Sequence, residues 1–154
     1  MEELHVEIRA MAEGDKSVVF ALAEEVLKPL ADAAGHPELF HEDEFIDLME
    51  RAEVWIADTP HDPPEVAGYV ITEAGEGCLT VRCLCVSPAF EECRVDHRLL
   101  DWAEGLAYHR GLERLTAPTT GGDERARELY LDHDYAPSAA DDRPDAIVMV
   151  KRLR

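Results

Sequence analysis

The chain is short of positive charge and has no long apolar run. Of its 154 residues, 34 are acidic and 15 are lysine or arginine, so the formal net charge is −19. A surface of this sign repels a phosphate backbone, and we therefore expect no nucleic-acid partner. We find neither a run of about eighteen apolar residues nor a basic leader followed by an apolar segment. The sequence thus predicts no membrane span, no signal peptide and a cytoplasmic location.

Cysteine is scarce and is not arranged in metal-binding pairs. The four cysteines are Cys78, Cys83, Cys85 and Cys93, and they form no set of paired C-x-x-C motifs. Because structural zinc sites usually take four ligands at such spacings, we assign no metal ligands. Cys83 and Cys85 fall on one face of an expected strand, where we interpret them as small buried hydrophobic residues.

The acidic residues are spread along the chain and are not gathered in a tail. Such a surface is typical of a protein from a salt-rich cytoplasm, where the Debye length falls to about 3 Å at 1 M salt. We therefore predict a halophilic protein. The alternative is that the charge steers a cationic substrate such as a polyamine or a basic peptide.

Length and hydrophobicity favour one compact domain over residues 1–154, since 46% of the residues are apolar. Hydrophobic periodicity predicts the order strand, helix, helix, three strands, helix, strand, helix and two strands. The expected fold class is α+β, with a mixed, mostly antiparallel central sheet flanked by helices.

Three strands in the middle of the chain are connected by turn-rich segments and most simply form an antiparallel meander. We place them at residues 54–57, 66–72 and 79–86. Near the start of the chain, Ser17 is the expected cap of the first helix.

Residues 86–100, with the sequence VSPAFEECRVDHRLL, lead from a strand through a loop into a helix. Pro88 stops the strand because proline cannot donate to a β-ladder. Apolar residues then recur at helical spacing up to Gly111, which predicts a helix over about 93–110. The strand expected at 112–117 would follow by a parallel crossover.

This segment resembles the acetyl-CoA binding segment of the GNAT superfamily of N-acyltransferases, in which a strand ending V-x-P precedes an R/Q-x-x-G-x-G/A loop and a helix. Matching positions are occupied by Val86, Pro88, Leu99 and Leu100. The Arg/Gln and the two glycines of the loop are replaced here by Glu91, Arg94 and Asp96. In the family, backbone amides of this loop and the helix dipole hold the pyrophosphate.

The resemblance extends along most of the chain. Residues 6–15 resemble the opening strand and turn of the family, and residues 147–153 resemble its closing strand. Residues 123–135 resemble the phrase N-x-x-A-x-x-L-Y-x-x-x-G-F, with matches at Ala126, Leu129 and Tyr130. The family further implies that the fourth and fifth strands part to form a cofactor groove.

The resemblance implies acetyl-CoA as co-substrate and an amine of a small molecule or a protein as acceptor. The cofactor-binding residues that it implies are Val86, Arg94, Val95, Asp96, His97 and Arg98. Arg94 leaves two alternatives open. A tight loop that needs positive φ tolerates arginine poorly, whereas a helix that simply starts earlier tolerates it well.

Tyr130 stands where the family often has its general acid, and a phenol can protonate a leaving thiolate. The alternative is a core tyrosine on an amphipathic helix. The strand position that often carries a glutamate base is Arg82, which cannot accept a proton. Glu73, Glu76, His133 or a chain of water molecules are candidate substitutes.

Two functions therefore remain open. The first is an acyl-CoA-dependent N-acetyltransferase that acts by direct attack of an amine on the thioester. The second is a catalytically inactive GNAT-fold protein that serves as a binding or assembly module. A homodimer, frequent among relatives, is a further expectation.

Overall fold

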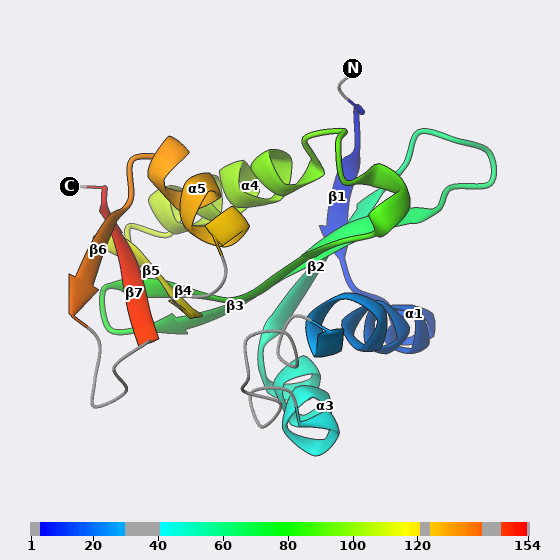
Figure 1. Cartoon of the computed structure of the whole chain (residues 1–154), viewed down its shortest axis with the longest axis horizontal. Coiled ribbons are helices and arrows are strands. Elements are labelled where there is room, and N and C mark those ends of the chain that lie inside the picture. The colour runs from blue at the N-terminus through cyan, green and yellow to red at the C-terminus, as the bar shows by residue number, and fades with distance from the viewer. Residues whose placement is uncertain (1–3, 30–40, 121–123, 140–145, 154) are drawn as a thin grey trace.

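The computed structural model describes residues 4–29, 41–120, 124–139 and 146–153 (Figure 1). The strands are β1 (Glu7–Ala10), β2 (Glu53–Asp58), β3 (Val66–Gly75), β4 (Cys78–Val86), β5 (Arg114–Thr120), β6 (Ala136–Ala139) and β7 (Ala146–Arg152). The helices are α1 (Lys16–Leu22), which continues as a π-helical turn (Ala23–Leu27), α3 (Glu42–Arg51), α4 (Val95–His109) and α5 (Glu124–Asp132). Short 3₁₀ turns lie at Glu13–Asp15 and Pro88–Phe90.

One seven-stranded sheet in the order β1-β2-β3-β4-β5-β7-β6 forms the middle layer. Its neighbouring strands are antiparallel except for the parallel pair β4 and β5. Helices α4 and α5 lie on one face, and α1 and α3 lie on the other (Figure 1). The predicted α+β class, the element order and the meander of β2, β3 and β4 are confirmed. Within the part of the chain described, no helix has both the length and the apolar character needed to cross a bilayer.

The start of α1 differs from the prediction. The helix begins at Lys16 after a 3₁₀ turn, so Ser17 lies inside it and is not its cap. Asp15 organises this turn, because its carboxylate accepts the Ala12 N–H at 2.8 Å and an N–H of the Arg9 guanidinium at 2.6 Å. Arg9 also donates to Asp58 at 2.6 Å and so joins β1, β2 and the helix start. The hydrogen bond from Arg9 lowers the pKa of Asp15.

The sheet carries one hydrophobic core on each face. The core under α4 and α5 includes Leu79, Leu99 and Leu115, all fully buried. The core under α1 and α3 includes Cys85, and Cys83 packs against it. Burial is the main cause that raises the pKa of both thiols, so they stay protonated and act as apolar residues, as predicted.

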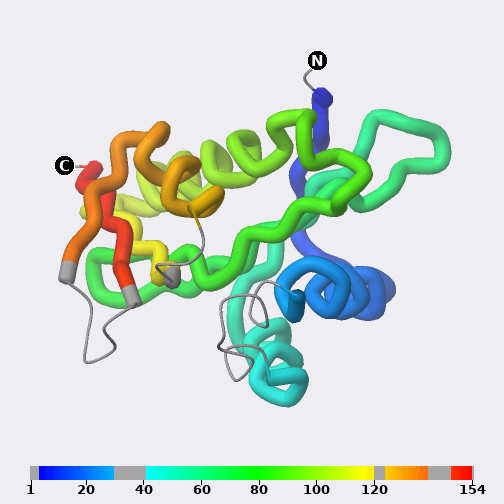
Figure 2. Tube along the Cα trace, viewed as in Figure 1, coloured from blue at the N-terminus to red at the C-terminus, as the bar shows by residue number. Residues whose placement is uncertain are grey.

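Strands β4 and β5 part soon after they meet. Their pairing covers Cys78–Thr80 on β4 and Arg114–Thr116 on β5. Beyond these residues β4 follows β3, and β5 follows β7 to Thr120. Figure 2 shows the chain leaving the far end of β4 and turning back into α4, with α5 alongside. The expected divergence of the fourth and fifth strands is therefore present, next to the helix that the sequence singled out.

Candidate active site

The loop before α4 keeps a glycine-like turn although it has no glycine. Arg94, the residue before the helix, has φ 59° and ψ 27°, in the left-handed region. This conformation costs a non-glycine residue about 1–2 kcal/mol. Of the two alternatives left open by the sequence, the strained turn is the one present. The backbone thus follows the path that a glycine at this position would permit, at a cost in stability.

The first turn of α4 has no side-chain cap from Arg94, and a side chain of the turn itself accepts one of its N–H groups. The first intrahelical hydrogen bond runs from the Arg98 N–H to the Arg94 carbonyl oxygen at 3.2 Å. The Asp96 carboxylate accepts the N–H of His97 at 2.9 Å. Helix N-termini attract anions through such N–H groups and through the helix dipole. Here the Asp96 carboxylate already accepts a hydrogen bond from one of these N–H groups, that of His97.

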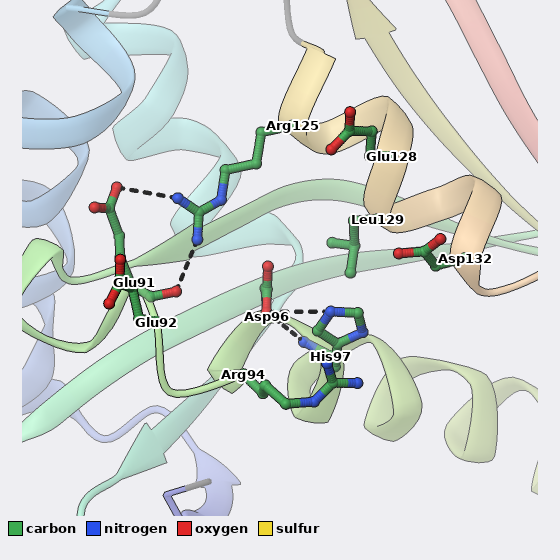
Figure 3. Close-up of a pocket in the computed structure, with 9 residues that line it drawn as sticks. All are labelled: Glu91, Glu92, Arg94, Asp96, His97, Arg125, Glu128, Leu129 and Asp132. Atoms are coloured by element: carbon green, nitrogen blue, oxygen red, sulfur yellow. Dashed lines mark hydrogen bonds and ion pairs between the residues drawn. The ribbon is translucent and has the colours of Figure 1, made fainter. Parts of the chain in front are cut away.

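A pocket of about 260 Å³ lies between this first turn and α5 (Figure 3). Five carboxylates line it, namely those of Glu91, Glu92, Asp96, Glu128 and Asp132, against the guanidiniums of Arg94 and Arg125 and the imidazole of His97. Arg125 reaches across from α5, with its guanidinium 3.4 Å from the Glu91 carboxylate and 2.7 Å from the Glu91 carbonyl oxygen. The pocket is therefore acidic, and one of its two guanidiniums is held by the loop.

The structure gathers only part of the predicted cofactor-binding set at this pocket. Its walls include Arg94, Asp96 and His97. The Val95 side chain is fully buried in the core, which leaves only its backbone for a ligand. Arg98 lies on the same turn but outside the described pocket lining, and Val86 ends β4 opposite Gly68. Cofactor binding by these residues stays a prediction.

Tyr130 lies on α5 and is 5% exposed, in the core between α5, α4 and the sheet. The centroid of its ring is 5.2 Å from that of Tyr135. Its carbonyl oxygen accepts the Tyr135 N–H at 2.9 Å, which closes the end of the helix. Asp134, at the glycine position of the family phrase, has φ 69°. This second left-handed residue is an aspartate, a type that tolerates the conformation better than most.

The candidate bases lie on both faces of the sheet. Val81 and Cys83 pair with Thr72 and Ile71, so Arg82 is the extra residue of a β-bulge in β4. Its guanidinium lies 3.8 Å from the Glu73 carboxylate.

Glu73 also forms an ion pair with Arg51 of α3. Two guanidiniums therefore engage the carboxylate that the sequence offered as a substitute base. His133 lies on the other face of the sheet, in contact with α4, and Glu76 is exposed in the turn after β3.

One contact was missed by the sequence reasoning. His97 Nδ1 lies 3.0 Å from His133 Nε2, which joins the first turn of α4 to the end of α5. The two rings stack at 5.1 Å between centroids. The histidines are far apart in the chain, and no local pattern signals that they pair.

Comparison with solved structures shows the same fold in several acetyltransferases. A PaiA N-acetyltransferase from Thermoplasma acidophilum, solved in complex with coenzyme A, superposes with a TM-score of 0.77 at 14% identity, over 97% of this chain and 100% of that chain. The ribosomal-protein-S18-alanine N-acetyltransferase from Escherichia coli gives 0.76 at 17% identity, over 97% and 94%. A GNAT-family acetyltransferase from Listeria monocytogenes gives 0.76 at 15% identity, over 97% and 96%.

These identities are low, and the likenesses show the fold alone. No curated protein matches the chain in sequence. The family model described as acetyltransferase (GNAT) family matches residues 20–135, which is most of the chain. This segment contains β4, the strained turn at Arg94, all of α4 and the helix that carries Tyr130. The chain therefore belongs to the GNAT acetyltransferase family.

Proposed function

We propose that the protein is an acyl-CoA-dependent N-acetyltransferase that transfers an acetyl group to an amine by direct attack. The observation that supports this most is the left-handed turn at Arg94. A turn that costs stability persists where the surroundings require it, and such strain is concentrated at functional sites. It aims the first turn of α4 at the pocket beside α5.

The residues of the pocket fit a diphosphate in part. The amides at the start of α4 supply donors, and the guanidiniums of Arg94 and Arg125 supply charge. The Asp96 carboxylate must leave the His97 N–H before a phosphate oxygen can accept it. The remaining carboxylates repel the ligand, and salt screens this repulsion. We therefore expect cofactor affinity to rise with salt, which is the reverse of the usual dependence.

The transfer step needs one proton acceptor and one proton donor. The acceptor amine attacks the thioester carbonyl, so a C–N bond forms, the nitrogen loses its proton to a chain of water molecules, and the C–S bond breaks. The leaving thiolate takes a proton, which we assign to the Tyr130 hydroxyl. Proton transfer from a positioned group contributes about 10²–10⁴-fold to a rate. The acceptor is an amine of a small molecule or of a protein.

A second function is favoured by two features of the structure. Asp96 already satisfies the His97 N–H, and Arg82 stands on the strand where a base is expected. Both features suit a family member that no longer catalyses and serves as a binding or assembly module.

Thiol release from acetyl-CoA, measured with a panel of polyamines, amino acids and peptides, separates the two functions. We expect turnover with at least one amine, and Tyr130→Phe should lower kcat by about 10²-fold or more. Tyr108→Phe is the matched control, because Tyr108 is 56% exposed on α4. Equal kcat in the wild type and Tyr130→Phe would remove the role of Tyr130. Binding of acetyl-CoA without turnover on any amine would favour the second function.

A further inference from the structure

Three side chains with metal-binding atoms converge where the end of α5 meets α4. Asp101 and Glu104 lie on α4, and His133 follows α5. The Nδ1 atom of His133 lies 3.5 Å from Asp101 Oδ1 and 3.6 Å from Glu104 Oε1. The side chains of His133 and Glu104 are only 12% and 15% exposed, whereas that of Asp101 is 63% exposed. His133 and Glu104 are thus mostly buried, and solvent reaches the cluster at Asp101.

These separations suit a shared ion better than direct hydrogen bonds. An N–H···O bond usually spans about 2.7–3.2 Å, which is shorter than either N···O separation here. In a tetrahedral zinc site with bonds of about 2.0–2.1 Å, two ligand atoms lie about 3.3 Å apart. The ligand atoms of the three side chains all lie within 4.8 Å of one another. Small side-chain adjustments therefore bring them to one coordination sphere.

The second nitrogen of His133 has the partner that a metal-binding histidine needs. His133 Nε2 lies 3.0 Å from His97 Nδ1. When Nε2–H donates to His97, the lone pair of His133 Nδ1 faces the two carboxylates. Metal-bound histidines almost always donate their other ring N–H, which fixes the tautomer and the orientation of the ring. His97 is thus a positioning residue for this cluster.

Lys151 of β7 is the cation already present at the cluster. Its Nζ lies 3.2 Å from Glu104 Oε1 and 5.8 Å from the centroid of the Tyr135 ring. The ammonium is thus paired with one of the two carboxylates of the cluster. The ammonium therefore competes with a metal ion for Glu104.

We propose that Asp101, Glu104 and His133 bind a divalent transition metal, best matched by Zn²⁺, with water completing the shell. One imidazole nitrogen and two carboxylate oxygens are ligands that zinc accepts. The bound ion would connect α4 to the chain directly after α5, one helical turn beyond Tyr130. The three ligands lie apart from the cysteines, whose spacing was the ground for expecting no metal ligands.

The test uses the full chain after treatment with EDTA, titrated with Co²⁺ and then with Zn²⁺. We expect one Co²⁺ per chain, seen as visible absorption bands that Zn²⁺ abolishes, and a higher thermal midpoint with Zn²⁺. His133→Gln and Asp101→Asn should each weaken binding by at least about tenfold, because losing even a residue that only hydrogen-bonds to a ligand costs that much. Lys151→Gln should tighten binding because it removes the competing ammonium.

His109→Gln is the matched control, since His109 is exposed at the other end of α4. It should bind Co²⁺ as the wild type does. Asp101→Asn should leave the fold intact because the Asp101 side chain is mostly exposed. Circular dichroism checks that each variant is folded. The proposal is overturned if folded protein takes up no stoichiometric metal, if Asp101→Asn binds as the wild type does, or if Cys93→Ser alone abolishes binding. None of these readouts depends on acetyl-CoA.

Discussion

The carboxylate of Asp96 accepts the backbone N–H of His97 at 2.9 Å, in the first turn of α4. The contact lies one turn from the strained Arg94 and inside the acidic pocket beside α5 (Figure 3). A ligand that accepts this N–H must therefore first displace the Asp96 carboxylate.

Removing the Asp96 charge should therefore favour the cofactor. Asp96→Asn is expected to lower the Kd for acetyl-CoA by about three- to tenfold in dilute buffer, because charge near a helix N-terminus is worth about 0.3–1 kcal/mol and repulsion adds to it. Calorimetric titration of both proteins measures the change. Asp47→Asn is the control, because the Asp47 side chain is exposed on α3, on the opposite face of the sheet. This variant should leave the Kd unaltered. If Asp96→Asn bound acetyl-CoA as weakly as the wild type or more weakly, the Asp96 carboxylate would not be what opposes the cofactor.

The left-handed turn should be measurable as strain. Arg94→Gly is expected to raise the free energy of unfolding by about 0.5–1 kcal/mol, since glycine relieves the turn but gains entropy when unfolded. Arg98→Gly, one turn further into α4, should instead lower it by about 1 kcal/mol, as glycine does in a helix interior. Urea denaturation of the two variants gives the comparison. A loss of stability in Arg94→Gly would mean that the arginine side chain outweighs the strain.

The Arg9–Asp15 pair should contribute stability that acid removes. Because the pKa of Asp15 is lowered in the folded chain, its contribution is present above the pKa of the unfolded state and lost as pH falls through the folded value. Asp15→Asn should cost about 1 kcal/mol at pH 7 and progressively less below about pH 4. Urea denaturation at several pH values checks this slope. A cost independent of pH would show that the carboxylate charge is not what matters.

The net charge of −19 should make stability depend on salt. Raising KCl from about 0.1 M to 2 M is expected to increase the free energy of unfolding, because the Debye length falls well below 10 Å and self-repulsion weakens. Near pH 4 many carboxylates are protonated, so the same step should have a smaller effect. Thermal unfolding at the two pH values distinguishes screening from a general salt effect. Destabilisation by KCl at pH 7 would contradict a halophilic surface.

Local sequence patterns were sufficient to predict the elements whose structure is decided by neighbouring residues in the chain. Pro88 ends the strand region of β4, and the spacing of Val95, Leu99 and Leu106 gives α4. The sequence also offered the positive φ of Arg94 as one of two alternatives, because a glycine position was recognisable without its glycine.

Contacts between distant segments were not predictable in the same way. Ser17 was wrong as a cap because Arg9, held by Asp58 of β2, fixes Asp15 and moves the helix start. Likewise, His97 and His133 pair only once α4 and α5 pack together. Sequence periodicity describes one element at a time, and both of these features depend on two or more.

The most direct test of cofactor binding is calorimetric titration of acetyl-CoA into the wild-type chain in about 2 M KCl. We expect saturable binding with a Kd near micromolar and weaker binding in dilute buffer. Absence of binding up to millimolar acetyl-CoA, in protein shown by circular dichroism to be folded, would contradict the claim that the strained loop at Arg94 holds a cofactor diphosphate.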